Sequence, residues 1–202
     1  GARPNIVLIM ADDMGFSDIG CFGSEIDTPN IDRMSSKGMK FTRFHNAARC
    51  CPTRASLLTG LYPHQAGVGH MTSDHGDPHY QGYLNRGCLT IAEALRPAGY
   101  RTYASGKWHV GEDPGQRPLD RGFDKYFGTL AGGSDYFNPR GRSKLARGND
   151  IVLAWDDFYT TDEYTEHAMS CIEDTAPGEP FFSYLAYNAP HWPLHAKTED
   201  IE

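Results

Sequence analysis

The strongest constraint on the fold of this chain is that its hydrophobic runs end in clusters of polar residues. Asn5 to Ala11 reads as a buried strand and is followed at once by Asp12-Asp13-Met14-Gly15. Tyr100 to His109 reads as a strand that runs into a Gly-Lys turn, and Phe181 to Tyr187 as a strand that leads to His191. Segments with helical signals lie between these strands. This alternation predicts a doubly wound α/β fold with a mostly parallel sheet, whose ligands collect at the carboxyl ends of the strands.

The expected helices are defined by the residues that begin and end them. Thr28 is placed to cap a helix that has Pro29 at its first position and ends at Gly38. Further helices are predicted over residues 52–59, 90–98 and 160–175. Residues 39–45 alternate loosely, which favours another strand. Residues 132–150, rich in Gly, Arg, Asn and Ser, are typical of a long functional loop.

Composition limits the size of the fold and its partners. A chain of 202 residues that is 39% hydrophobic can form one sizeable core, so we expect one domain or a large piece of one. The net charge of −7, with 26 acidic against 19 basic residues, excludes a basic stripe for nucleic acid. The longest apolar run, residues 6–11, is far too short to span a bilayer. No signal peptide precedes the first strand, which predicts that a targeting segment was removed or that the sequence starts after one.

The cysteines do not form a disulfide pattern. There are five, an odd number, with no repeated spacing and no Cys-x-x-Cys pair that would indicate structural zinc. Cys50 and Cys51 are adjacent, and a disulfide between neighbours requires a strained ring. Pro52 is suited to the first turn of a helix, so this pair is predicted at a helix N-terminus, where free N–H groups favour anions. Arg54, one turn further on, can bind an oxyanion at the same place.

Three other polar groups follow predicted strands. Asp12 and Asp13 repel each other unless a cation lies beside them, and their hard oxygens suit calcium or magnesium, although a solvated turn would show the same pair. Lys107 offers a fixed charge and His109 can exchange a proton near neutral pH; in an extended chain both side chains point the same way. His191 lies between two prolines, which fix its backbone. Each group, taken alone, is also common on surfaces that carry no site.

The segment Cys50-Cys51-Pro52-Thr53-Arg54, followed by Leu58-Thr59-Gly60, resembles the signature of the sulfatase family, which is Cys-x-Pro-Ser/Ala-Arg and then Leu-Thr-Gly. Thr53 is a mild departure. The Asp12-Asp13 pair, the helix near Pro29, the Lys107-x-His109 turn and the Pro190-His191 loop also follow the family's order, so the resemblance spans nearly the whole chain. It implies an alkaline-phosphatase-like fold and identifies residues 1–202 as the N-terminal part of a sulfatase catalytic domain, whose C-terminal remainder is absent.

The resemblance singles out Cys50, the residue two before the proline. In sulfatases this cysteine is oxidised by a maturation enzyme to Cα-formylglycine, whose aldehyde hydrates to a geminal diol. One diol oxygen attacks the sulfur of a sulfate ester, and the second hydroxyl then expels sulfate, so the nucleophile carries its own release mechanism. Sulfatases add an Asp-Asn metal pair and a second lysine from downstream, which nothing here matches. The resemblance therefore implies an incomplete metal site and little activity for this stretch alone.

The remaining roles are carried over by matching motifs. Asp12, Asp13 and residue 50 would bind a divalent cation, calcium or alternatively magnesium. Arg54 would hold the hydrate and Lys107 a sulfate oxygen. His109 would accept the proton that triggers sulfate release, and His191 would bind the ester and protonate the leaving alcohol.

The substrate is expected to be a sulfated small molecule or glycan, and its alcohol part is not readable from the sequence. Ser134, Asp135 and Tyr136 lie near the family's substrate side, and Tyr136, Phe137, Arg140 and Arg142 could suit a sulfated sugar. Three alternatives stay open at this point: a phosphonate or phosphodiester hydrolase of the same superfamily, a non-catalytic binding protein on the same fold, and an enzyme that uses a Cys50 or Cys51 thiol directly. Sulfatases usually act outside the cytoplasm, so we expect a periplasmic or secreted protein.

Overall fold

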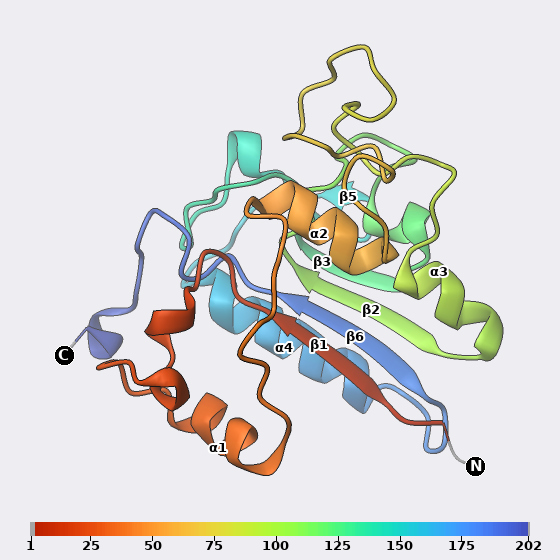
Figure 1. Ribbon diagram of the computed structural model, residues 1–202. Helices are drawn as coiled ribbons and strands as arrows, with labels where there is room; N and C mark the ends of the chain where they lie inside the picture. The colour runs from red at the N-terminus through yellow and green to blue at the C-terminus, as the bar shows by residue number, and fades with distance from the viewer. Residues whose placement is uncertain (1–2, 202) are drawn as a thin grey trace.

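The structure is a computed structural model that describes residues 3–201. A six-stranded sheet forms its centre, in the order β1-β6-β2-β3-β4-β5 (Figure 1). The pairs β1–β6, β6–β2 and β2–β3 are parallel, and the last two pairs are antiparallel. This confirms the predicted mostly parallel α/β sheet. The strands are β1 (Ile6–Met10), β2 (Arg101–Gly106), β3 (Lys125–Thr129), β4 (Leu145–Arg147), β5 (Asp150–Ile151) and β6 (Phe181–Ala186).

Helices lie on both faces of the parallel part of the sheet, with α2 and α3 on one face and α4 on the other (Figure 1). All of the predicted helices are present: α1 (Pro29–Lys37), α2 (Cys50–Thr59), α3 (Ile91–Leu95) and α4 (Thr160–Glu173). Thr28 occupies the position before α1, yet its hydroxyl donates to the Asp32 carboxylate at 2.9 Å instead of capping the helix. No helix among the described residues is long and apolar enough to cross a membrane. Short 3-10 turns occupy Phe16–Asp18, Gly20–Phe22, Arg96–Ala98, Pro118–Arg121, Gly141–Ser143 and Thr198–Asp200.

Aromatic side chains fill the layers on both sides of the sheet. On the side of α2, Phe182 and Tyr184 of β6 stack against Phe123, with ring centroids 6.0 and 6.4 Å apart. On the side of α4, Phe127 of β3 meets Tyr164 edge to face at 6.1 Å. A fully buried phenylalanine contributes about 1.5–3 kcal/mol. The parallel strands are therefore held firmly between two apolar layers, and the loops at their carboxyl ends start from fixed points.

β1 is buried on one face only. Leu8 packs on the α2 side of the core, whereas Val7 and Ile9 point to the other face and are 51% and 53% exposed. The prediction of a buried strand is wrong for that face, because β1 is an edge strand and α4 packs against β2, β3 and β6. Its parallel orientation is confirmed by its pairing with β6.

Two other predictions about local structure fail. Residues 39–45 form no strand: Met39, Phe41 and Phe44 are 80%, 63% and 76% exposed, and within residues 3–201 no strand pairs with this segment. Residues 132–150 are more regular than a loop, because β4 and the start of β5 lie there and β4 pairs with β3. β3 itself was not predicted, since five residues that include Gly128 give little periodic signal.

Candidate functional site

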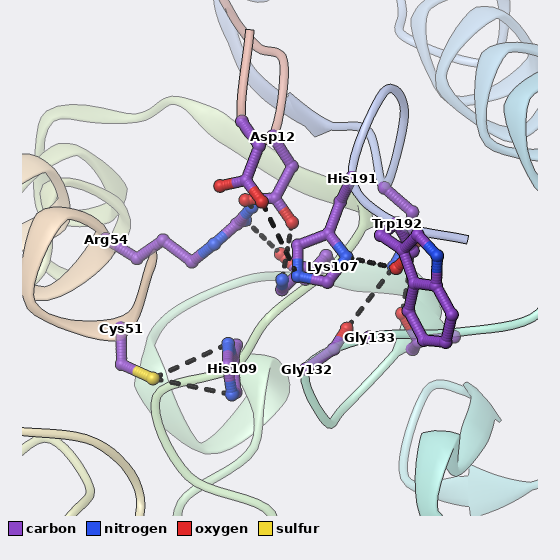
Figure 2. Close-up of polar contacts among 12 residues, drawn as sticks. Asp12, Cys51, Arg54, Lys107, His109, Gly132, Gly133, His191 and Trp192 are labelled. Carbon is purple, nitrogen blue, oxygen red and sulfur yellow. Dashed lines mark hydrogen bonds and ion pairs between the residues drawn. The ribbon is translucent and has the colours of Figure 1, made fainter. Parts of the chain in front are cut away.

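The carboxyl ends of β1, β2 and β6 meet as predicted and bring Asp12, Lys107 and the loop at residues 188–191 together (Figure 2). The backbone N–H of Asp12 donates to the carbonyl of Ala189 at 3.0 Å. Its carboxylate, 2% exposed, accepts a hydrogen bond from Lys107 Nζ and lies 3.2 Å from Arg54 Nη2. Since Arg54 and Lys107 are both fully buried, one carboxylate faces two cations, which leaves a surplus of positive charge.

Arg54 connects the ends of three strands. It projects from α2, and its Nη1 donates to the carbonyl of Lys107 at 2.8 Å and to the hydroxyl of Tyr184 at 3.3 Å. Burial opposes its charge, but Tyr184 and Asp12 outweigh that effect and raise the pKa of Arg54. Its Nε and Nη2 atoms are buried and have no hydrogen-bond acceptor among the described residues. The contact between Nη2 and Asp12 is therefore an ion pair that lacks hydrogen-bond geometry. Unpaired buried donors of this kind indicate that an oxyanion is their acceptor.

Both thiols of the Cys50-Cys51 pair lie beside His109. The ligand atoms of the three residues are within 4.8 Å of one another, and Cys51 Sγ is 3.5 Å from Nδ1 and 3.4 Å from Nε2 of His109 (Figure 2). The hydrogen bond from Cys51 lowers the pKa of Cys50 to about 3, helped by His109 and Lys107 and opposed by burial. The same hydrogen bond, together with burial, raises the pKa of Cys51. Negative charge is therefore stabilised at the Cys50-Cys51 pair, beside His109 and Lys107.

The start of α2 adds to this effect. The helix begins at Cys50, two residues earlier than predicted, and its first backbone hydrogen bond runs from Thr53 N to the carbonyl of Arg49 at 3.0 Å. The N–H groups ahead of Thr53 have no partner within the helix, and Arg49 provides no side-chain cap. Free N–H groups and the helix dipole favour an anion at this end. The prediction that Cys50 lies at a helix N-terminus is confirmed.

Lys107 and His109 enter the site by different routes. β2 ends at Gly106, and His109 has a φ of 58°, so this stretch is not extended and the expectation that both side chains point the same way is wrong. Gly106 has a φ of 100°, and a Cβ there would lie 1.9 Å from the carbonyl oxygen of Ala186. The turn at this glycine sends Lys107 to Asp12, whereas His109 reaches the two thiols.

Asp13 and His191 lie at the outer rim of the site. Asp13 has a φ of 64°, its side chain is 62% exposed, and its Oδ2 is 3.6 Å from His191 Nε2. The backbone around His191 is held by Tyr136, whose hydroxyl donates to the carbonyls of His191 at 2.6 Å and Asn188 at 3.0 Å. Tyr136 is only 1% exposed. Tyr136, which the sequence suggested as suited to a sulfated sugar, is instead buried and holds the loop that carries His191.

Two glycines that sequence reasoning did not assign lie between the histidines. A Cβ on Gly132 would be 2.8 Å from Cε1 and Nε2 of His109, and one on Gly133 would be 3.2 Å from Cε1 of His191. Figure 2 shows both glycines beside the imidazole rings. Any side chain at Gly132 would displace His109. The available signal was a Gly-Gly pair directly after the run Phe-Gly-Thr-Leu-Ala, where a ligand approaches the backbone.

The carboxylates of Asp12 and Asp13 have the donor type that calcium or magnesium requires, but calcium takes about 6–8 oxygen ligands. Within residues 3–201, the only group of three or more candidate ligand side chains around one point is Cys50, Cys51 and His109. That set of sulfur and nitrogen suits softer metals. The carboxylates of Asp12 and Asp13 therefore match a hard divalent cation in donor type.

The model of the sulfatase family matches residues 4–202 of this chain. The chain belongs to the sulfatase family. This sulfatase chain is 40% identical to the arylsulfatase of Klebsiella aerogenes, over 99% of this chain and 46% of that protein. It is 34% identical to human N-acetylgalactosamine-6-sulfatase, over 96% of this chain and 40% of that protein. The chain thus spans less than half the length of the curated relatives that it matches.

Solved structures agree with this assignment. Ps i-CgsB in complex with k-i-k-neocarrahexaose superimposes with a TM-score of 0.87 at 36% identity, over 98% of this sulfatase chain and 48% of that one. BT4656 in complex with its substrate D-glucosamine-2-N,6-O-disulfate gives a TM-score of 0.76 at 30% identity, over 94% and 35% of the two chains. The sheet and flanking helices described above are therefore the alkaline-phosphatase-like fold that the sequence predicted.

Proposed function

We propose that residues 1–202 are the N-terminal part of a sulfatase catalytic domain, and that the natural protein containing them hydrolyses sulfate esters at residue 50. The observation that carries this proposal is the position of Cys50, at the N-terminus of α2 and beside His109, near a surplus of buried positive charge. A sulfate ester is an anion with three terminal oxygens. Lys107 and the unpaired Nε and Nη2 of Arg54 are donors of the kind that bind such oxygens.

Residue 50 acts after oxidation of Cys50 by a formylglycine-generating enzyme. The hydrated aldehyde then supplies one hydroxyl for attack on sulfur and a second for release of sulfate. Two features of the chain favour this state. The helix N-terminus stabilises an oxyanion at residue 50, and the free donors of Arg54 offer hydrogen bonds that a thiol does not use. Cys51 stays a thiol in the core, where it is fully buried.

The two histidines are placed for proton transfer in opposite directions. His109 contacts the position of the nucleophile and accepts the proton whose loss expels sulfate. His191, at the rim, is 24% exposed at its side chain and donates a proton to the leaving alcohol as the S–O bond to that alcohol breaks. The net reaction converts a sulfate ester and water into an alcohol, sulfate and a proton.

The cation of this site would be held on one side by Asp12, Asp13 and residue 50. When bound, a calcium ion would supply positive charge that stabilises the attacking oxygen and the sulfuryl group. Lys107 and Arg54 meanwhile hold the Asp12 carboxylate in position through two ion pairs. Calcium is the preferred assignment, with magnesium as the alternative, because carboxylate oxygens suit both ions.

A sulfated glycan is the proposed class of substrate. Among the structural neighbours, Ps i-CgsB is complexed with k-i-k-neocarrahexaose and BT4656 with its substrate D-glucosamine-2-N,6-O-disulfate. Both share the fold at 30% identity or more. The periplasmic or extracellular location expected for such an enzyme stays a prediction.

The test uses the full natural protein that contains this chain, coexpressed with a formylglycine-generating enzyme. Mass spectrometry of the peptide around residue 50 should detect the aldehyde, and turnover of an aryl sulfate should exceed that of an aryl phosphodiester. Cys50→Ala should reduce turnover at least about 10³-fold, because the nucleophile is lost. Cys51→Ala, the matched control, should still acquire the aldehyde and still turn over substrate.

The alternatives give different results in the same experiment. Faster turnover of the phosphodiester would identify a phosphodiester hydrolase on this fold. An unoxidised thiol at residue 50 in a protein that still binds sulfated ligands would favour a non-catalytic binding protein. If the protein turns over substrate without any aldehyde, and this turnover is lost in Cys50→Ala or in Cys51→Ala, the enzyme uses a thiol directly.

A further inference from the structure

A cavity of about 440 Å³ opens beside His109, and Asp12 does not line it. Its volume lies within the range of small-ligand pockets, about 300–1,000 Å³, and is sufficient for a sugar ring. The reacting centre at residue 50 and this cavity share His109 as a common wall. The lining also includes Thr72, Glu112, Gly132, Arg142 and Lys144.

The backbone around Arg142 and Lys144 is hydrogen-bonded to residues 130–131, which precede Gly132. Leu130 N donates to the carbonyl of Lys144 at 3.1 Å, and Ala131 N to that of Ser143 at 3.3 Å. Ser143 N in turn donates to the carbonyl of Arg140 at 3.2 Å. The segment 130–131 leads directly into Gly132, against which the His109 ring lies. Arg142 and Lys144 therefore hold a defined position relative to the catalytic histidine.

The cavity contains one cation more than the protein neutralises. Lys144 Nζ forms an ion pair with Glu112 at 2.8 Å. The guanidinium of Arg142 has no ion pair or hydrogen bond with any of residues 3–201. Lys144 also adopts a φ of 47°, a left-handed conformation that costs about 1 kcal/mol or more for a residue other than glycine. Arg142 is exposed, so its guanidinium is open to an anion that enters the cavity beside the strained Lys144.

We propose that Arg142 and Lys144 form a subsite for a second anionic group of the substrate, a sulfate or a carboxylate, next to the sulfate ester that reacts at residue 50. This rests on the proposed function and narrows it: the preferred substrate is a glycan with at least two negative charges. The planar guanidinium of Arg142 binds such an oxyanion through two parallel hydrogen bonds, and Lys144 adds charge beside it. An aryl sulfate with one charge reacts without using the subsite.

The experiment compares the matured full-length protein with its Arg142→Gln, Arg142→Lys and Lys144→Gln variants. Arg86→Gln is the matched control, because Arg86 is an exposed arginine that does not line the cavity. The probes are an aryl sulfate and three sulfated oligosaccharides. One oligosaccharide carries a second sulfate, one carries a uronate carboxylate, and one carries no second anionic group. Turnover is measured for all four, and calorimetric binding of the oligosaccharides is measured in parallel.

Arg142→Gln should lower kcat/KM and binding about tenfold or more for the doubly charged oligosaccharides, since a charge-assisted hydrogen bond is lost. Turnover of the aryl sulfate and of the singly charged oligosaccharide should stay within about twofold. Arg142→Lys should recover part of the loss, and Arg86→Gln should behave as wild type. The size of the loss for the sulfate and the carboxylate probes identifies which anion the subsite prefers.

Two failures are distinguishable. If Arg142→Gln affects all four probes equally, or binds the doubly charged oligosaccharides as well as Arg86→Gln does, the subsite is disproved while sulfatase activity stands. If the wild-type protein turns over none of the sulfate esters, the proposed function fails. The binding data still decide the subsite in that case, because they do not depend on turnover.

Discussion

β6 and β1 are neighbours in the sheet and are both strongly hydrophobic, yet they are buried to very different extents. All six residues of β6 are buried, whereas every second residue of β1 is about half exposed. Leu185 of β6 and Ile9 of β1 are partners in the parallel register, and they are 7% and 53% exposed. The difference arises because α4 covers β6 and stops short of β1.

The contrast between β1 and β6 separates the hydrophobicity of a strand from the extent to which it is buried. A hydrophobic run indicates that a strand is suited to burial, and the elements packed around it decide how much of it is buried. The site depends on both strands, because Asp12 follows the exposed edge strand and Asn188 follows the covered one. Variants on the exposed strand β1 and on the side covered by α4 measure how much each contributes to stability. They follow in order of decreasing expected effect.

The largest effect is expected where the edge strand ends. Asp12→Asn should reduce the free energy of unfolding by about 3–5 kcal/mol, because two fully buried cations would lose their common carboxylate. Asp13→Asn, one residue further on, should change it by less than about 0.5 kcal/mol, since that side chain is 62% exposed. Urea denaturation of the two variants measures the contrast. Equal values would mean that burial at the end of β1 does not stabilise the fold.

The paired residues of the two strands come next. Leu185→Ala should cost about 2–5 kcal/mol, because it leaves a cavity between β6 and α4. Ile9→Ala should cost less than about 1 kcal/mol, since half of that side chain is already in water. Both values come from chemical denaturation under the same conditions. If Ile9→Ala is as destabilising as Leu185→Ala, the difference in burial between the two strands does not determine their contributions to stability.

The covered face should also respond to pH. Burial, with smaller effects from Arg147 and Lys125, lowers the pKa of His167 on α4 to about 4, whereas the unfolded chain titrates near 6.5. The unfolded state therefore takes up a proton first as the pH falls. Stability is complete above pH 6.5 and is lost progressively toward pH 4, by about 2 kcal/mol between pH 7 and pH 5. Denaturation at each pH measures this slope, which should disappear in His167→Gln.

The smallest effect is expected for an ion pair at the surface of the covered face. Lys125 and Asp174 are 2.9 Å apart, with side chains 41% and 61% exposed. Lys125→Gln should change the free energy of unfolding by less than about 1 kcal/mol, because exposed ion pairs are weak and screened by salt. A thermal melt at low and high salt checks this. A larger loss would show that charge, in addition to apolar burial, holds α4 on the sheet.

The sequence was sufficient where a single residue type is compatible with one local structure. Pro52 and Gly60 marked both ends of α2 closely, and polar residues after hydrophobic runs marked the carboxyl edge of the sheet. Prediction failed where the outcome depends on distant packing. Val7 and Ile9 are exposed because of the position of α4, and among residues 3–201 no neighbouring strand is available to pair with residues 39–45.

The same distinction applies to the candidate site. Its family motifs indicated Asp12, Asp13, Cys50, Arg54, Lys107, His109 and His191. In the structure Asp12 contacts Arg54 and Lys107, Cys50 lies beside His109, and Asp13 lies beside His191. The motifs did not indicate which other residues hold these side chains in position. Tyr136 supports the His191 loop through a hydrogen bond to a backbone carbonyl, a contact between residues distant in sequence. Gly132 matters only because His109 adopts a left-handed turn that brings its ring against the glycine.

The contacts of Arg54 make it a reporter on the integrity of the whole sheet. Its side chain meets the segments that follow β1 and β2, and a tyrosine within β6. Its Nη1 protons, which donate to the carbonyl of Lys107 and the hydroxyl of Tyr184, can be replaced by solvent deuterium only when these contacts open. Their exchange should therefore be as slow as that of the core amides. One nitrogen-15 resonance from this side chain would then report the cooperative opening of strands that are far apart in the sequence.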